Sequence, residues 1–268
     1  MPISPTGFGT DPRAAAEIWD ALTLWMLGRI DEALPLAERA LADAESAAHA
    51  PTMAIALSYA AVLGLLRRNP EAVATYSQAL ADMVSRYDLS AFWTGYAVFF
   101  QGWARWSEGA EASRLAEMRR GLTINQEQGR NWALPSFEAA LAEAEAATGE
   151  TDAGLRRLAD ARAEAERTEQ RWYEAEMCRI RAQILLKRGP VNTAAAEQSL
   201  QAAIAIAQSQ KARSFELRAA LSLAKLYRAA SRDADAHAVL APAVEDFPPT
   251  QQFPELSEAQ TLLAARSP

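Results

Sequence analysis

Cysteine and histidine, from which most metal sites and many nucleophilic sites are built, are scarce in this sequence. The 268 residues include one cysteine, Cys178, and two histidines, His49 and His237. A single cysteine excludes a disulfide within the chain and favours a reducing compartment. The three residues lie far apart, without further ligands at short spacing, so they match no zinc motif. We interpret them as structural residues and expect neither a bound metal nor a cofactor.

Long hydrophobic runs and targeting signals are missing as well. The longest apolar stretch, residues 60–66, is far shorter than the roughly 20 residues that span a membrane. Residues 1–4 lack the basic and apolar regions of a signal peptide. The net charge of −7 disfavours nucleic acid or an anionic membrane as the main partner. We therefore expect a cytoplasmic, soluble protein that binds neither nucleic acid nor membrane.

Runs of β-branched residues, which favour sheets, are almost absent. Half of the residues are hydrophobic and 23% are charged, which is typical of a globular protein. Alanine, leucine, glutamate and arginine dominate, and these side chains lose little rotamer freedom in a helix. The composition predicts an all-α fold.

A repeat of close to forty residues runs through the chain. Six candidate second helices align at positions separated by 39, 42, 40, 42 and 40 residues. In these helices a small residue follows three positions after a larger one, as in Leu200 and Ala203, which allows a neighbouring helix to approach closely. Such a steady period is typical of stacked helix pairs. The aligned positions are Ala33, Ala72, Arg114, Gly154, Ala196 and Ala236.

Glycine follows three of the first helices, at Gly28, Gly109 and Gly189, where a left-handed backbone would end a helix at little cost. Arg67 and Ser231 take the equivalent position in two other pairs, so those turns should be strained or differently shaped. No Gly/Ser-rich linker or charged block divides the chain, and we predict one domain over residues 1–268. Its predicted repeats are 11–47, 51–85, 90–124, 132–167, 171–208 and 213–246, with a terminal helix at 255–265.

Four segments of the chain resemble a known class of repeat protein: 102–109 (GWARWSEG), 118–122 (MRRGL), 171–189 and 214–228. They look like the C-terminal tetratricopeptide-like repeat region of bacterial predicted-ATPase and adenylate-cyclase-type signalling regulators. The resemblance covers about residues 9 to 264. It implies a right-handed superhelical solenoid of about six tetratricopeptide-like antiparallel helix pairs plus a C-terminal helix. The first helices of such pairs line a concave face.

Two departures limit what the resemblance implies. Glu17 and Asp20 stand where the family would have apolar or small residues. No cyclase segment and no glycine-rich phosphate-binding loop is present, so neither cyclase nor ATPase activity is carried over. The chain is then either a fragment of such a regulator or a shorter protein that uses only its sensor-like part, and its abrupt beginning favours the fragment.

Four large aromatic residues, Tyr96, Phe99, Trp103 and Trp106, follow one another at intervals of three, four and three. This spacing places them on one stripe of a helix, and the repeat register assigns the stripe to the concave side. Aromatic stripes dominate buried cores as well as binding hot spots. Two interpretations therefore stay open, core packing and a recognition surface.

The same register continues from aromatic into charged residues. The arginines and the lysine among them suit an anionic group or a peptide carboxylate. Surface salt bridges with the many glutamates are the alternative. This predicted continuation of the ligand-binding surface comprises Glu143, Glu176, Arg179, Gln183, Arg218, Lys225 and Arg228.

We predict a non-catalytic binding module that recognises a peptide, protein segment or small ligand on its concave face, as the sensor or interaction part of a bacterial signalling regulator. No catalytic motif is present in the sequence. The alternative is an unusual enzyme with a closed solenoid pocket that uses Glu143, Glu176 and Arg179 beside the aromatic stripe. A homo-oligomer formed through an uncapped end near Trp19 and Trp25 is the remaining hypothesis.

Overall fold

The structure is a computed structural model that describes residues 12–109, 112–129, 132–245, 247–248, 250 and 253–265. Throughout these residues the chain is helical between short connections, with no β-strand, which confirms the all-α prediction. None of these helices is long and apolar enough to cross a membrane. The α-helices are α1 (Pro12–Met26), α2 (Ile30–Ser46), α3 (Ala50–Leu66), α4 (Pro70–Tyr87), α5 (Ala91–Glu108), α6 (Ala112–Glu127), α7 (Leu134–Ala147), α8 (Thr151–Thr168), α9 (Glu174–Lys187), α10 (Thr193–Gln210), α11 (Arg213–Ala229), α12 (Asp233–Val244) and α13 (Pro254–Ala264).

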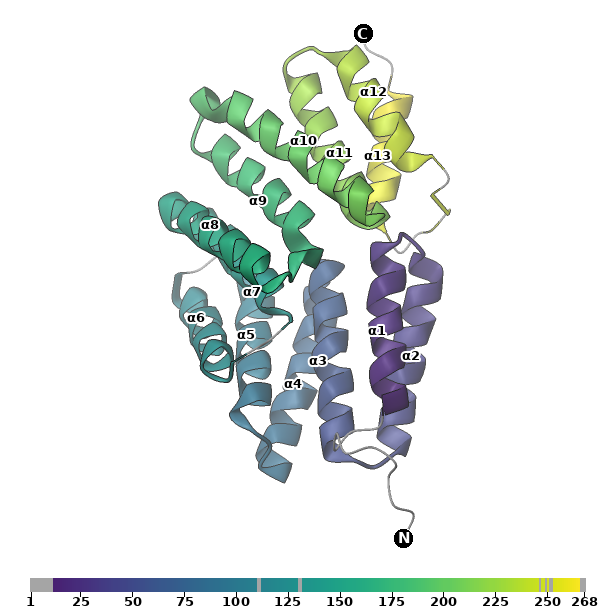
Figure 1. The fold of residues 1–268 in the computed structure, drawn as a ribbon, viewed down its shortest axis with the longest axis vertical. Helices are drawn as coiled ribbons and strands as arrows, with labels where there is room; N and C mark the ends of the chain where they lie inside the picture. The colour runs from purple at the N-terminus through teal and green to yellow at the C-terminus, as the bar shows by residue number, and fades with distance from the viewer. Residues whose placement is uncertain are drawn as a thin grey trace. The chain divides into compact units, whose positions relative to one another are not determined.

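Two consecutive helices lie on each predicted repeat range, with bounds that agree to within a few residues (Figure 1). Helices α3 to α6 pack each on the next, and so do α8 to α12. Two pairs of alternate helices also touch, α3 with α5 and α9 with α11. This packing agrees with a helical-repeat solenoid, in which each element contacts its neighbours along the chain.

The turns end the first helices in different ways. Gly28 (φ 83°) and Gly189 (φ 122°) are left-handed, as predicted. Gly109 has φ −177°, an extended backbone that any residue can adopt, so the prediction of a left-handed glycine there is wrong. Ser231 takes φ 57°, and in the second pair Arg68 (φ 54°), one residue beyond Arg67, is the left-handed position. A Cβ atom makes this conformation unfavourable, so both turns carry the expected strain.

The chain folds into two compact units, whereas the repeat pattern predicts one domain. Unit 1 comprises residues 1–24 and 32–144, and unit 2 comprises residues 25–31 and 145–268. Helices α3 to α6 belong entirely to unit 1. Helices α8 to α13 belong entirely to unit 2.

Helices α5 and α6 of unit 1 approach until their backbones touch. A Cβ atom built on Gly121 of α6 would lie 2.4 Å from the backbone nitrogen of Phe99 of α5. Gly121 is one of the small residues that follow a larger residue in the predicted second helices. Its place against α5 confirms that close helix approach requires a small side chain there.

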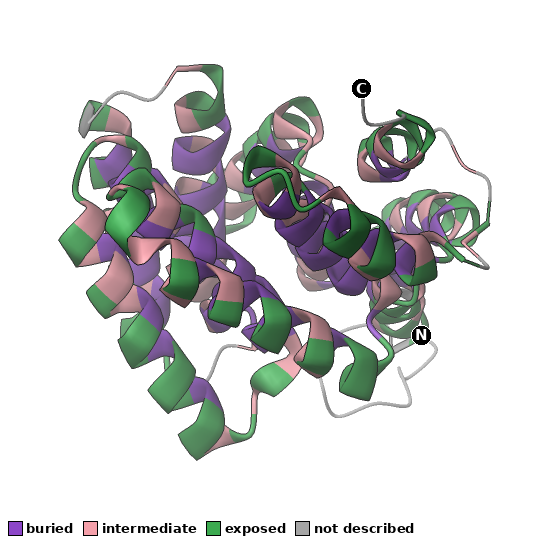
Figure 2. Cartoon of the chain, turned by 90° about the horizontal axis from the view of Figure 1, so that it is seen from above, coloured by how far each residue is buried: buried purple, intermediate pink, exposed green. Residues whose placement is uncertain are grey.

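In unit 2, α9 packs against α8, α10 and α11, while α13 contacts α11 and α12. Cys178, Ala203 and Ala219 form a buried cluster between α9, α10 and α11. Some helices show a buried and an exposed side, whereas others are buried over most of their length (Figure 2). Helices α8 and α10 belong to the first kind, and α9 and α11 to the second. Ala203 is again a predicted small position, and its burial follows from the helix approach that the repeat pattern indicates.

Candidate functional site

The predicted aromatic stripe lies on α5 within unit 1. Tyr96 and Phe99 are fully buried and Trp103 is 4% exposed, whereas Trp106 is half-buried. Phe99 stacks on Phe137 of α7 with ring centroids 4.2 Å apart, and Tyr96 packs edge-on against the same ring. Three of the four side chains therefore pack the core of unit 1. Core packing, the first of the two interpretations, describes these three residues, and they present no exposed recognition surface.

The three residues of the enzyme hypothesis are divided between the units. Glu143 belongs to unit 1, where its Oε2 accepts a hydrogen bond from Arg68 Nη2 at 3.0 Å. Glu176 and Arg179 belong to unit 2 and are paired with each other. Each carboxylate is thus held by an arginine of its own unit, which is the arrangement of a structural ion pair.

Helix α9 buries a pair of opposite charges in unit 2. Glu176 is 1% exposed and Arg179 is 4% exposed. Arg179 Nε and Nη2 donate hydrogen bonds to Glu176 Oε2 and Oε1 at 2.8 and 2.7 Å. Two parallel charge-assisted hydrogen bonds fix both side chains in position. Gln183, the next predicted site residue on this helix, is exposed.

A second buried arginine, Arg218 of α11, extends this pair. Its Nε donates to Glu255 Oε1 at 2.7 Å, and its Nη1 lies 3.9 Å from Glu176 Oε1. The guanidinium carbon is 5.0 Å from the ring centroid of Trp25 and 5.5 Å from that of Phe253. Arginine suits such a site because it is weakly hydrated and is attracted to aromatic faces. We use the name arginine cluster for Glu176, Arg179, Arg218 and Glu255.

The arginine cluster is electrically balanced, and removing any one of its four side chains leaves one charge without its counterpart. Two guanidinium groups face two carboxylates, and the side chain of Arg218 is only 4% exposed. Removing a charge from water costs several kcal/mol, so a guanidinium at this depth is strongly unfavourable unless it is paired. The position beside Arg218 therefore requires a carboxylate, and Glu255 of α13 supplies it.

Polar contacts at the start of α11 hold the arginine cluster in place. Ser214 Oγ donates to the backbone oxygen of Trp25 at 2.5 Å. Arg213 Nη1 pairs with Glu216 Oε2 at 2.6 Å, and its Nη2 donates to the backbone oxygen of Glu245 at 2.7 Å. These bonds tie the first turn of α11 to its surroundings in unit 2, so Arg218, one turn later, has a fixed position.

Three predicted site residues, Arg218, Lys225 and Arg228, lie along α11, and we name them the basic row. Each of them contacts α13. Lys225 Nζ lies 2.7 Å from Glu258 Oε1, and both side chains are about half exposed. Arg228 Nη1 donates to the backbone oxygen of Leu262 at 3.3 Å. Each residue of the basic row has an acidic partner on α12 or α13, as the salt-bridge alternative describes, and the terminal helix lies over the row.

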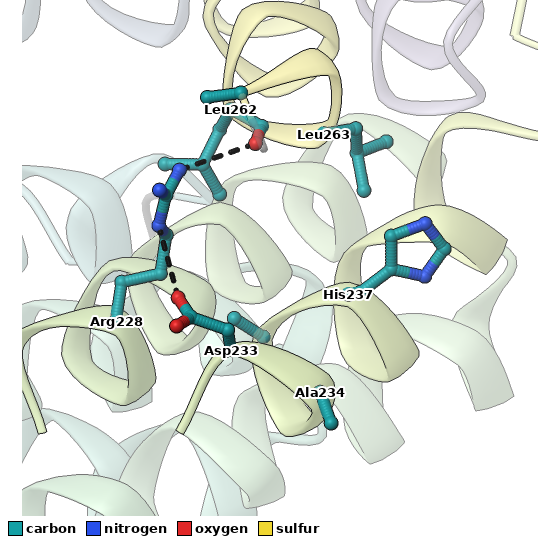
Figure 3. Close-up of a pocket in the computed structure, with 8 residues that line it drawn as sticks. Arg228, Asp233, Ala234, His237, Leu262 and Leu263 are labelled. Carbon is teal, nitrogen blue, oxygen red and sulfur yellow. Dashed lines mark hydrogen bonds and ion pairs between the residues drawn. The ribbon is translucent and has the colours of Figure 1, made fainter. Parts of the chain in front are cut away.

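A pocket of about 300 Å³ lies between α11, α12 and α13. Figure 3 shows Arg228 between Asp233 and the backbone oxygen of Leu262, with His237 of α12 on the other side of the view. Arg228 Nε lies 3.4 Å from Asp233 Oδ1. Leu263 of α13 also lines this space. Helix α13 therefore covers the basic row without filling the space beside α12.

Trp19 and Trp25, on which the self-association hypothesis rests, have different environments. Trp25 is fully buried in unit 2. Trp19 of unit 1 is 37% exposed and packs against Tyr59 and Trp132, with ring centroids 5.1 and 4.2 Å away. Burial raises the pKa of the Tyr59 hydroxyl, and the two indoles offset only part of that effect. Trp19 therefore belongs to a partly exposed aromatic cluster, and self-association through it stays a prediction.

Cys178 lies in the core of unit 2, between α9 and its neighbours. Burial raises the pKa of its thiol, so little of the reactive thiolate is present at neutral pH. Cys178 thus serves as a small apolar core residue. In the part of the chain that the structure describes, no group of three or more histidine, cysteine, aspartate or glutamate side chains is placed to hold a metal ion.

Sequence reasoning did not identify the residues that α13 brings to the basic row. Glu255 and Glu258 are three residues apart, so they share one face of a helix. They closely follow Phe253, whose ring lies beside Arg218. The sequence signal for this pairing is that α11 carries basic residues and the predicted terminal helix carries acidic ones. That signal is weak, because acidic residues occur on most of the described helices.

Comparison with known sequences relates this chain to part of a longer protein. No protein-family model matches the sequence. An uncharacterized protein of Rhizobium meliloti (strain 1021) is 29% identical over 206 residues, which make up 77% of this chain. The aligned residues make up 20% of that relative, so the chain spans about a fifth of its length. The chain is therefore similar to one part of a much longer protein.

Proposed function

We propose that this chain is a non-catalytic interaction module that binds a peptide or protein segment through the basic row and the arginine cluster. The observation that carries the proposal is the buried Arg218, whose charge is met by a carboxylate from another element, Glu255. A desolvated arginine beside aromatic rings is selective, because an uncharged group placed opposite it leaves a buried charge unpaired. The site is therefore suited to an acidic segment.

The proposal also covers the type of helical repeat and the kind of protein to which the chain belongs. The helix pairs form a right-handed superhelical solenoid of tetratricopeptide type, and the chain is the sensor or interaction part of a bacterial signalling regulator. The packing of neighbouring helices from α3 to α6 and from α8 to α12 supports the first statement. The second is supported by the relative, in which the aligned residues occupy only 20% of the length. A module of this size within a longer chain suits recruitment or sensing for other domains.

Labelled helical peptides test this function by fluorescence anisotropy. We expect saturable binding of peptides that carry two glutamates three residues apart, and loss of binding when both become glutamine. Lys225→Ala combined with Arg228→Ala should weaken binding about tenfold, because each removes a partly exposed charge worth up to about 1 kcal/mol. Arg156→Ala is the matched control, since it removes an exposed arginine from α8. Equal binding of the glutamate and glutamine peptides would contradict the proposal.

A further inference from the structure

We propose that α13 is an occupant of the binding site in cis, and that the partner of this site is an acidic amphipathic helix with the same pattern as α13. This inference rests on the proposed function and specifies its partner. Three contacts in line support it: Arg218 with Glu255, Lys225 with Glu258, and Arg228 with the backbone oxygen of Leu262. Residue numbers rise together along both helices, so α13 runs alongside α11 in the same direction.

The charge beneath α13 is unbalanced unless that helix is in place. Without Glu255, the arginine cluster holds two guanidinium groups, Arg179 and Arg218, against one carboxylate, Glu176. Arg179 already takes both oxygens of Glu176 at 2.7 and 2.8 Å, and Arg218 Nη1 is 3.9 Å from that carboxylate. The buried surface under α13 therefore lacks one negative charge of its own. Any helix that covers it must bring a carboxylate to the place of Glu255.

The apolar side of α13 defines the rest of the partner's pattern. Phe253 is 1% exposed and packs against Trp25 with ring centroids 5.9 Å apart. Leu256 and Ala259 are buried as well. The partner should therefore repeat the residue types of this segment at the same spacing. In order, these are an aromatic residue, a carboxylate, a leucine, a second carboxylate and a small residue, at the places of Phe253, Glu255, Leu256, Glu258 and Ala259. Spacings of three on a helix place the anchors on one face, as in other helix-in-groove contacts.

Part of the contact between α13 and α11 is hydrated and incomplete. Lys225 and Glu258 are 48% and 52% exposed, so their ion pair holds α13 less strongly than the more buried pair of Arg218 and Glu255 does. The pocket of about 300 Å³ lies at the far end of α13, beside Leu262 and Leu263.

The probe is a labelled peptide with the sequence of residues 253–265, added in trans to the full chain. Glu258→Lys places two positive charges together and loosens α13 in cis. We expect this chain to bind the peptide about tenfold more tightly than wild type, because a site that is occupied in cis has a smaller competent fraction. Lys225→Glu should weaken binding of the wild-type peptide to the chain. A peptide that carries the Glu258→Lys change should bind the Lys225→Glu chain with restored affinity. Glu166→Lys, at an exposed site on α8, is the matched control.

Hydrogen exchange of the α13 amides gives a readout that needs no added peptide. Glu258→Lys should speed exchange across residues 254–264, and adding Lys225→Glu to the same chain should restore protection. Unchanged exchange together with equal peptide affinity in both chains would overturn cis occupancy. Faster exchange in the Glu258→Lys chain without any binding of this peptide would mean that α13 only covers the end of unit 2. That result would also overturn the inference. In this experiment the proposed function itself fails if wild type and the Glu258→Lys chain both bind no acidic peptide.

Discussion

The two compact units bury different kinds of polar side chain. Among the described residues, the buried polar groups of unit 1 are small and uncharged, whereas every buried carboxylate and guanidinium lies in unit 2. Unit 1 also carries the aromatic core built on Phe99 and Phe137. The buried polar residues of unit 1 are Thr52, Ser58, Ser77, Asn125 and Ser136; the buried charged residues of unit 2 are Glu145, Glu174, Glu176, Arg179, Glu216 and Arg218.

This difference changes what each unit requires of its surroundings. Ser58 Oγ donates to the backbone oxygen of Ala54 at 2.7 Å, and Asn125 Nδ2 donates to that of Gly121 at 3.0 Å. Such groups are satisfied within their own helix. Arg218 instead depends on Glu255, which is 37 residues away in the chain. The buried charges of unit 2 therefore include one that requires a partner from another helix, whereas the buried polar groups of unit 1 do not.

The largest effect is expected from the aromatic core of unit 1. Phe137→Ala should lower the free energy of unfolding by about 3–5 kcal/mol, because it leaves a cavity against Tyr96, Phe99 and Phe100. Urea denaturation measures the change. Tyr87→Ala, at a side chain that is 53% exposed, is the control and should stay within about 0.5 kcal/mol of wild type. A loss below about 1 kcal/mol for Phe137→Ala would show that this cluster does not carry the stability of unit 1.

Breaking the buried ion pair of unit 2 should come next. Glu176→Ala leaves Arg179 buried without its carboxylate and should cost about 3 kcal/mol in the same experiment. Replacing both residues, as Glu176→Leu with Arg179→Met, should recover most of this loss, because the remaining Arg218 and Glu255 balance each other. A double variant as unstable as the single one would mean that the fold of unit 2 depends on the ion pair itself. Unit 2 would then require buried charges for its stability, unlike unit 1.

The smallest effect concerns Glu174 and the response of unit 2 to pH. Burial works against its charged form, but hydrogen bonds from Arg171 and Arg162 outweigh it and lower the pKa of Glu174 below 4.5. Because the folded-state pKa is the lower one, its contribution is complete above about pH 5 and is lost as the pH falls through the folded pKa. Both arginines are partly exposed, so the contribution should be about 1 kcal/mol or less.

Chemical denaturation at a series of pH values checks this prediction. Glu174→Gln should be less stable than wild type at pH 7, and the two curves should converge as the solution becomes acidic. Asp160→Asn, at an exposed position on α8, is the control and should leave the pH dependence of wild type unchanged. A constant difference between Glu174→Gln and wild type at every pH would show that packing, and not the charge, explains the effect of Glu174.

Helix positions were predictable because their signals are local. Pro70 at the start of α4 and Gly28 after α1 act on neighbours within a few positions, and the observed bounds follow them. The period of close to forty residues repeats such local signals along the chain. Gly109 shows the limit of such reasoning, because its extended backbone depends on how the next helix approaches and not on glycine itself. The candidate site was predictable only in part. The sequence placed the three residues of the basic row on one helix, whereas it did not identify their partners Glu255 and Glu258.

The sequence by itself determined that this chain is helical, that its helices come in pairs and that a short helix follows the last pair. Helical periodicity repeats every three or four residues, so it can be read along one short stretch of sequence. Only the tertiary structure decided that Tyr96 and Phe99 are covered by Phe137, and that Arg218 meets a carboxylate beneath α13. A stripe of aromatic or charged residues is the same in sequence whether another helix covers it or not, and that covering helix comes from far along the chain.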